Sequence, residues 1–281
     1  MLNGLIPADR FLPYLTWKQI SEIKDIDNAV IILPTGSVEQ HGPHLPCAVD
    51  SIVANGIVGH ALSKLPDEIP AFGLPTIMYG KSDEHIHFPG TMTITGNVLY
   101  ETVIEIGESV YRSGFRKLLI VNAHGGQPQP LEMAARELRI RHADYIIIPK
   151  SAWSLPHDES FMTEEEKVLA MHAGHAETAI LLSLTPELVH MDEAKRSIPE
   201  RFPCPTLSAG RPAAAWCARD LTDTGVIGDP TRATTSQGAA LVADLAASWA
   251  KAITEVYQMK WPSKHATIGE ELNKYETSEI K

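Results

Sequence analysis

The chain has 281 residues, of which 44% are hydrophobic and 21% charged, and this is enough for a globular protein with a sizeable core. Its formal net charge of -11 argues against a nucleic-acid backbone or an anionic membrane surface as the main partner. The start of the chain lacks the basic and apolar segments of a signal peptide, and no apolar run approaches the roughly 20 residues that span a bilayer. The three cysteines form no CxxC pair, which favours a reducing compartment, so we expect a cytoplasmic protein.

Apolar runs and helical patterns alternate along the chain. After a short helix over residues 17–23, strands are expected at 29–33, 70–78, 117–121 and 145–148, and helices at 51–64, 97–114, 131–141, 163–170, 179–184 and 236–259. Residues 200–233 are rich in Pro, Gly and Thr and are expected to form loops with short elements. This alternation predicts a mainly parallel sheet with helices on both faces. We expect one domain over residues 1–281, ending in a polar tail over 262–281.

Potential metal ligands are dense in residues 36–50, directly after the first expected strand. Glu39, His41, His44 and Asp50 lie there, and Asp50 sits near the start of the next helix. Carboxylate and imidazole groups together suit a borderline metal such as Zn, Mn or Fe. Two loop polar residues and a helix cap explain the stretch equally well when it is taken alone.

Two later junctions carry the same residue types. His124 follows the strand at 117–121 and precedes Gly125 and Gly126, which let the backbone bend sharply near a ligand. His172 precedes a helix whose first turn holds Glu177, although the helix dipole also explains a carboxylate at that position. Because ligands bind outside the carboxyl ends of parallel strands, we expect these junctions to meet at one edge of the sheet.

The combined set fits two metal ions that activate a water molecule and polarise a substrate carbonyl. Asp50 is the expected bridging ligand, with His41 and His124 on one ion and Glu39 and Glu177 on the other. His172 is then left as a proton shuttle, which is a usual role of imidazole near neutral pH.

Several motifs together resemble the creatininase family of metal-dependent hydrolases. They are residues 35–46 with Asp50, then 88–91, 122–126, 172–174 with Glu177 and Thr178, and 225–230. The resemblance spans residues 30 to 240. It implies a three-layer α/β/α fold, a homo-oligomer that is often a hexamer, and a dinuclear Zn, Mn or Fe site. It also implies that Glu39, His41, Asp50 and His124 are ligands and that an acid/base group lies near His172.

One departure concerns the fifth ligand. Creatininases proper resemble this chain at residues 122–124 but carry a glutamate two residues after the histidine, where this chain has Gly126. The chain therefore resembles the Gly-Gly branches, which include a formylamide hydrolase, a peptide-trimming enzyme and a hydrolase that opens a keto-inositol ring. Glu177 is the expected fifth ligand, with a catalytic role beside His172.

Five further residues are expected to contact substrate: His85, Trp153, His175, Gly125 and Gly126. A structural loop histidine is an equal explanation for His85, and His44 is expected to support a ligand from behind. Arg211, Trp216 and Arg232 lie in the late loops, where packing or surface exposure explains them at least as well.

We expect a hydrolase that attacks a carbonyl of a small polar, cyclic amide-type substrate. Hydrolytic C–C cleavage of a cyclic diketone such as a keto-inositol is a close variant. A non-catalytic scaffold that keeps one structural metal is the alternative from another class.

Overall fold

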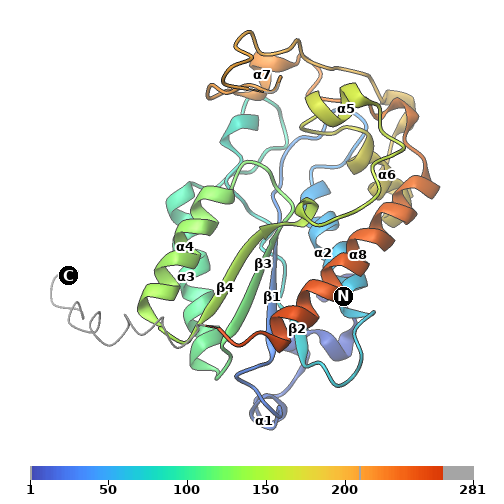
Figure 1. Ribbon diagram of the computed structural model, residues 1–281. Helices are drawn as coiled ribbons and strands as arrows, with labels where there is room; N and C mark the ends of the chain where they lie inside the picture. The colour runs from blue at the N-terminus through green and yellow to red at the C-terminus, as the bar shows by residue number, and fades with distance from the viewer. Residues whose placement is uncertain (1, 209, 262–281) are drawn as a thin grey trace, which may run out of the picture.

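Four parallel strands form the centre of the protein (Figure 1). The computed structural model describes residues 2–208 and 210–261, so the tail expected over 262–281 lies outside the described residues. The strand order is β2 (Ala71–Gly73), β1 (Val30–Thr35), β3 (Lys117–Asn122) and β4 (Ile146–Ser151). β1 and β3 pair along their whole length, from Val30 with Lys117 to Thr35 with Asn122. The predicted parallel sheet is confirmed.

Helices cover both faces of this sheet, as predicted for a three-layer α/β/α fold. α3 (Gly96–Arg112) and α4 (Pro128–Arg141) pack on one face, and α2 (Val49–Leu62) and α8 (Thr235–Gln258) on the other. α6 (His175–Leu184) packs against α2 and α8. The short helices α1 (Trp17–Ser21), α5 (Glu164–Leu169) and α7 (Ala218–Leu221) lie outside these layers (Figure 1).

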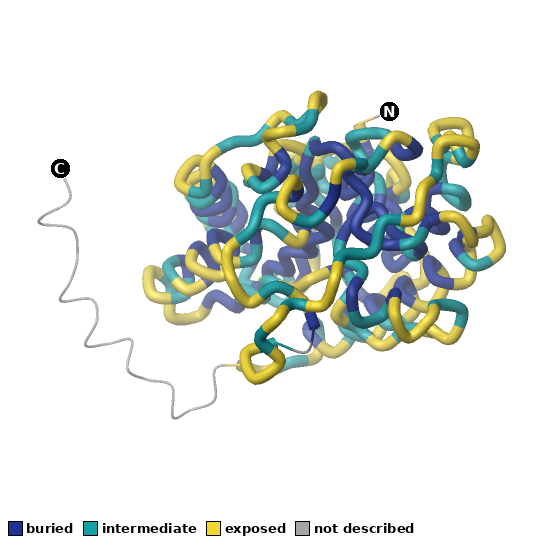
Figure 2. Tube along the Cα trace, turned by 90° about the horizontal axis from the view of Figure 1, so that it is seen from above, coloured by how far each residue is buried: buried dark blue, intermediate teal, exposed yellow. Residues whose placement is uncertain are grey.

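The apolar run in β1 is continuous because both of its faces are buried. Successive side chains point to opposite faces of a strand. Val30 and Ile32 therefore join the core with α2 and α8, whereas Ile31 and Leu33 join the core with α3 and α4. Figure 2 shows the buried residues gathered in the middle of the molecule, with exposed segments around them. Within the described ranges, none of the helices is both long and apolar enough to span a membrane.

Element boundaries differ from the sequence-based expectation at two informative places. β2 covers three residues of the extended run expected over 70–78, because Pro75 has no N–H to continue the ladder. α4 begins at Pro128 rather than at 131, and proline at the first position suits a helix start.

The connections after β1 and β3 leave the sheet in opposite directions. β1 leads to α2 on one face, while β3 leads to α4 on the other. Such a divergence between neighbouring parallel strands opens a crevice at their carboxyl ends, where ligands bind in open α/β sheets. The loops that carry Glu39 and His124 both begin there.

Candidate metal centre

The loop after β1 brings Glu39 and His41 next to Asp50. Asp50 is the second residue of α2 and lies in its first turn, while Ala48 occupies the cap position. The Ser37 hydroxyl donates to Asp50 Oδ2 at 2.5 Å, and the Ser82 hydroxyl donates to Glu39 Oε2. These hydroxyls fix two buried carboxylates in place before any ion binds.

Gly42 lets the chain turn back after His41. Its φ is +70°, in the left-handed region that glycine adopts without strain. A Cβ there would lie 2.4 Å from Val226 Cγ2, so a larger residue would also collide with the packing beneath the loop.

The end of β3 orients His124. The Asn122 side chain folds over the turn, accepting from the His124 N–H at 3.1 Å and donating to the His124 carbonyl at 2.7 Å. The ring Nε2–H donates to the Lys81 carbonyl at 2.9 Å. The other ring nitrogen, Nδ1, therefore faces Glu39 Oε2 and Asp50 Oδ2, each at 3.1 Å. A hydrogen bond at one ring nitrogen leaves the other nitrogen free to bind a metal.

His41 presents an unpartnered nitrogen to the same carboxylates. Its Nδ1–H donates to the Glu39 carbonyl at 3.1 Å, while the buried Nε2 has no hydrogen-bond partner among residues 2–208 and 210–261. Nε2 lies 3.4 Å from Asp50 Oδ1 and 4.0 Å from both Glu39 Oε1 and Glu177 Oε1. A buried ring nitrogen without a partner that faces three carboxylates is suited to bind a cation.

The turn before α6 orients Glu177. The backbone N–H of Ala173 donates to Glu177 Oε2 at 2.6 Å, which leaves Oε1 facing His41. Ala173 has φ +53°, a conformation that is strained for a residue with a Cβ. The backbone of the adjacent His172 pairs with that of Ile227, so the segment around Ile227 supports this turn.

The candidate ligands form three overlapping groups, and within each group one ligand atom of every residue lies within 4.8 Å of the others. The groups are Glu39, Asp50 and His124; His41, Glu177 and His172; and Glu39, His85 and His172. This grouping differs from the sequence-based expectation, which paired His41 with His124 and Glu39 with Glu177. The difference arises because His124 and Glu39 face each other across the β1–β3 crevice, whereas Glu177 approaches from α6.

The two oxygens of Asp50 face different imidazoles. Oδ1 points toward His41 and Oδ2 toward His124.

Neighbouring charges control the pKa values of this cluster. Burial alone would lower the pKa of His41, but Asp50, Glu177 and Glu39 outweigh it and raise this pKa to about 9. Burial, with repulsion from Asp50 and Glu39, raises the pKa of Glu177 to about 7.

Two further imidazoles stack beside this cluster. The ring centroid of His172 lies 4.1 Å from those of both His41 and His85. His172 Nε2–H donates to the Gln40 carbonyl at 2.6 Å, so Nδ1 faces Glu39 Oε1 at 3.5 Å. The Gln40 amide donates to His85 Nδ1 at 2.9 Å and to the Gly225 carbonyl at 3.1 Å. Burial and the neighbouring His41 and His85 hold the pKa of His172 well below its usual range.

Two cavities open onto these groups and meet at Met171, His172 and Arg211. One, of about 270 Å³, is lined by Glu177 and by two residues expected to contact substrate, Trp153 and His175. The other, of about 250 Å³, is lined by Glu39 and His124 and by the remaining expected residues, His85, Gly125 and Gly126. The structure therefore brings all five expected substrate residues to the cavity walls.

The sequence analysis gave no role to three residues that the structure places at the site: Gln40, Ser82 and Glu84. Gln40 connects two imidazoles, Ser82 holds Glu39, and Glu84 lines the smaller cavity. Ser82 and Glu84 could have been found from their position, because the loop after β2 also leaves the carboxyl end of a strand. Arg211 and Trp216, for which packing or surface exposure was the preferred explanation, also line the smaller cavity. His44, expected behind the ligands, is buried with Nε2 2.9 Å from the Thr178 hydroxyl.

A parallel α/β/α sheet with overlapping groups of carboxylate and imidazole ligands at its crevice defines a candidate metal-dependent hydrolase. The family model described as creatinine amidohydrolase, the creatininase family, matches residues 13–253. The chain belongs to the creatininase family and is a metal-dependent hydrolase.

Individual relatives carry three different names. A mycofactocin precursor peptide peptidase from Mycolicibacterium smegmatis is 32% identical over 220 residues, covering 77% of this chain and 81% of that protein. A creatinine amidohydrolase from Pseudomonas putida is 30% identical over 208 residues, covering 69% and 78%. A 3-dehydro-scyllo-inosose hydrolase from Thermotoga maritima is 29% identical over 203 residues, covering 70% and 63%.

Solved structures share the fold. A Bacteroides fragilis protein assigned as a creatinine amidohydrolase has a TM-score of 0.78 at 24% identity, covering 92% of this chain and 100% of that one. A manganese creatininase has a TM-score of 0.73, and a creatininase variant of the Zn–Zn type has 0.74. Both are 25% identical to this chain, and each match covers 89% of it. The match covers 99% of the manganese creatininase and 98% of the Zn–Zn variant.

Proposed function

We propose that this protein hydrolyses a carbon–nitrogen bond of an amide-type substrate with the help of two divalent metal ions, Zn, Mn or Fe. The observation that carries the proposal is the Asp50 carboxylate, whose two oxygens face the metal-binding nitrogens of two different histidines. A carboxylate in that position is suited to bridge two ions. Glu39 and His124 would complete one ion's ligands, and His41 and Glu177 the other's.

The donor set fits such ions. It combines three carboxylates with two neutral imidazole nitrogens, and divalent Zn, Mn and Fe accept both ligand types. Two bound ions would supply an activated water molecule and polarise the substrate carbonyl. The names of two relatives, a peptide peptidase and a creatinine amidohydrolase, agree with amide hydrolysis.

His172 is our candidate for moving the proton to the leaving group. It lines both cavities, and its Nδ1 faces the cluster while its Nε2–H is held by the Gln40 carbonyl. A substrate bound across the two cavities would therefore have its scissile bond beside this ring. The variant His172→Gln is expected to keep both ions and to lose most of kcat. Loss of an ion in this variant would make His172 a ligand instead.

The test of the function combines metal analysis with product analysis. We expect two ions per chain by elemental mass spectrometry, with activity lost on chelation and regained with Zn, Mn or Fe. Substrates would include linear peptides, lactams, formamides and cyclic diketones. Products from amides alone support the proposal, and products from cyclic diketones alone support the C–C hydrolase. One inert ion without turnover supports the scaffold.

Assembly and location are separate proposals. We infer a homo-oligomer, with a hexamer expected from the family resemblance, and a cytoplasmic location. Sedimentation of the metal-loaded chain tests the first, and fractionation of source cells tests the second.

A further inference from the structure

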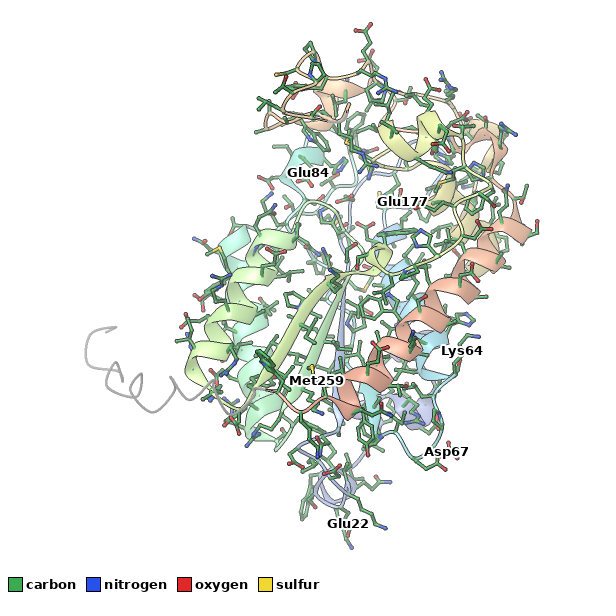
Figure 3. The ribbon with its side chains drawn as sticks, in the orientation of Figure 1. Glu22, Lys64, Asp67, Glu84, Glu177 and Met259 are labelled. Atoms are coloured by element: carbon green, nitrogen blue, oxygen red, sulfur yellow. The ribbon has the colours of Figure 1, made fainter. Side chains whose placement is uncertain are left out.

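Glu84 is a carboxylate in the smaller cavity that belongs to none of the groups of candidate metal ligands. It lies in the short helix Asp83–His85 after β2, and its side chain is 14% exposed. Figure 3 labels Glu84 and Glu177 on opposite sides of the upper end of the sheet. Two bound ions would compensate the charges of the three candidate ligand carboxylates, but they leave Glu84 without a role.

Gly126 makes room for this carboxylate. A Cβ on Gly126 would lie 1.6 Å from Glu84 Oε1 and 2.6 Å from His124 Nε2. Any side chain at position 126 would therefore displace Glu84 from its position. A Cβ on Gly125 would meet nothing within 4 Å, so the cavity is open beside the carboxylate. Oε1 of Glu84 thus lies against Gly126, and Glu84 and the glycine pair together line the cavity.

The neighbours of Glu84 leave Oε1 available. His124 Nε2 is 3.5 Å away, but its hydrogen bond goes to the Lys81 carbonyl at 2.9 Å. Lys81 Nζ lies 3.7 Å from the other oxygen, Oε2, and makes its shorter contact with Asp83. An ion pair at such a distance from a partly exposed lysine contributes little.

The wall of the cavity has two further charged or aromatic features. Trp216 lines it, and an indole face attracts a cation. Arg211 also lines it and would repel a cation, but its Nε and Nη2 donate to the Val168 and Lys167 carbonyls at 2.9 and 3.1 Å. The guanidinium is therefore held at the end of α5.

We propose that Glu84 determines substrate specificity by binding a cationic nitrogen group of the substrate, such as an ammonium or a guanidinium. This inference rests on the proposed amide hydrolysis and narrows it to amides that carry a basic group. A partly buried carboxylate favours a partner with charged N–H donors and disfavours a neutral isostere, because the neutral group leaves the charge unmatched.

Binding without turnover tests the inference first. The probes are methylguanidinium and N-methylurea, which match in shape and differ in charge, titrated by NMR into the metal-loaded full chain. We expect a preference of about 10- to 100-fold for methylguanidinium, typical of one charge-assisted hydrogen bond. Glu84→Gln should remove the preference, and Lys81→Met should keep or increase it. The control Glu105→Gln, an exposed position on α3, makes the same change of charge and should keep it.

Kinetics with a matched substrate pair follow. Alanine p-nitroanilide has a free ammonium, whereas N-acetylalanine p-nitroanilide does not. We expect Glu84→Gln to raise KM about 10-fold or more for the first only, with kcat and metal content unchanged. Equal probe affinities in the wild type, or loss of an ion in Glu84→Gln, would overturn the inference. A probe preference without hydrolysis of any amide would overturn the proposed function while leaving cation binding by Glu84 standing.

Discussion

Asp50→Asn is the most informative single change in the candidate metal centre. Asparagine has nearly the same shape as aspartate, and its amide oxygen keeps an acceptor for the Ser37 hydroxyl. The change removes one buried negative charge and turns one ligand oxygen into an N–H donor that faces an imidazole. Because the two oxygens of Asp50 face His41 and His124 separately, both ions are expected to bind more weakly.

The size of the effect follows from two steps. Loss of a charge-assisted contact costs about 1.5–3 kcal/mol, so each ion should bind roughly 10- to 150-fold more weakly. With each ion at 100 times its dissociation constant, the wild type gains about 2.7 kcal/mol per site, or about 5.4 kcal/mol in total. For a chain of this size that raises Tm by roughly 10–20 °C. After a 100-fold loss of affinity the same ions add about 0.8 kcal/mol and raise Tm by roughly 2–3 °C.

Calorimetry and metal analysis measure this directly. The chelated proteins would be scanned with and without added Zn or Mn, and the ions retained after dialysis would be counted. Asp144→Asn is the control, since Asp144 is an exposed carboxylate paired with Arg116 and makes the same change of charge. Two retained ions and a full rise of Tm in Asp50→Asn would refute the bridging role.

Three further changes test the electrostatics of the site. Glu177→Gln should lower the metal content from two ions to one while the group containing Glu39 stays loaded; a count of two would remove Glu177 from the ligands. The pKa of His41 is raised to about 9, the pKa of His124 lies well above its usual value, and the pKa of Glu177 is raised to about 7. Metal binding at pH 7 should therefore release more than one proton and affinity should rise toward pH 9, because the ligands must be deprotonated. Calorimetry in two buffers of different ionisation enthalpy counts these protons, and a count of zero would contradict the reasoning. Burial lowers the pKa of His44 to about 4, so its contribution to stability is complete above pH 6.5 and is lost as pH falls toward 4. Denaturant unfolding of the chelated protein over that range should show a loss of stability that is smaller by about 3 kcal/mol in His44→Gln than in the wild type.

The sequence predicted β1 and β3 well because burial on both faces leaves continuous apolar runs. β1 and β3 begin and end within two residues of their expected limits, and the three-layer arrangement is confirmed. The meeting of Glu39 and His124 also followed from topology, since their loops leave neighbouring strands at the same edge.

The sequence did not predict which ligands face each other. That depends on loop backbones, such as the turn at Ala173 that directs Glu177 toward His41. The role of Gln40 was equally hidden, because its partners His85, His172 and Gly225 are far apart in the chain. Residue types alone do not reveal contacts over such separations.

The left-handed conformation of Ala173 has a consequence for attempts to engineer a more heat-tolerant chain. A residue with a Cβ costs about 1–2 kcal/mol there, so glycine at this position would relieve strain and raise the melting point. Glycine adopts this conformation without strain, so the same change would keep the turn and the backbone N–H that holds the Glu177 carboxylate toward the cluster. Heat tolerance and metal binding would therefore not compete at this position.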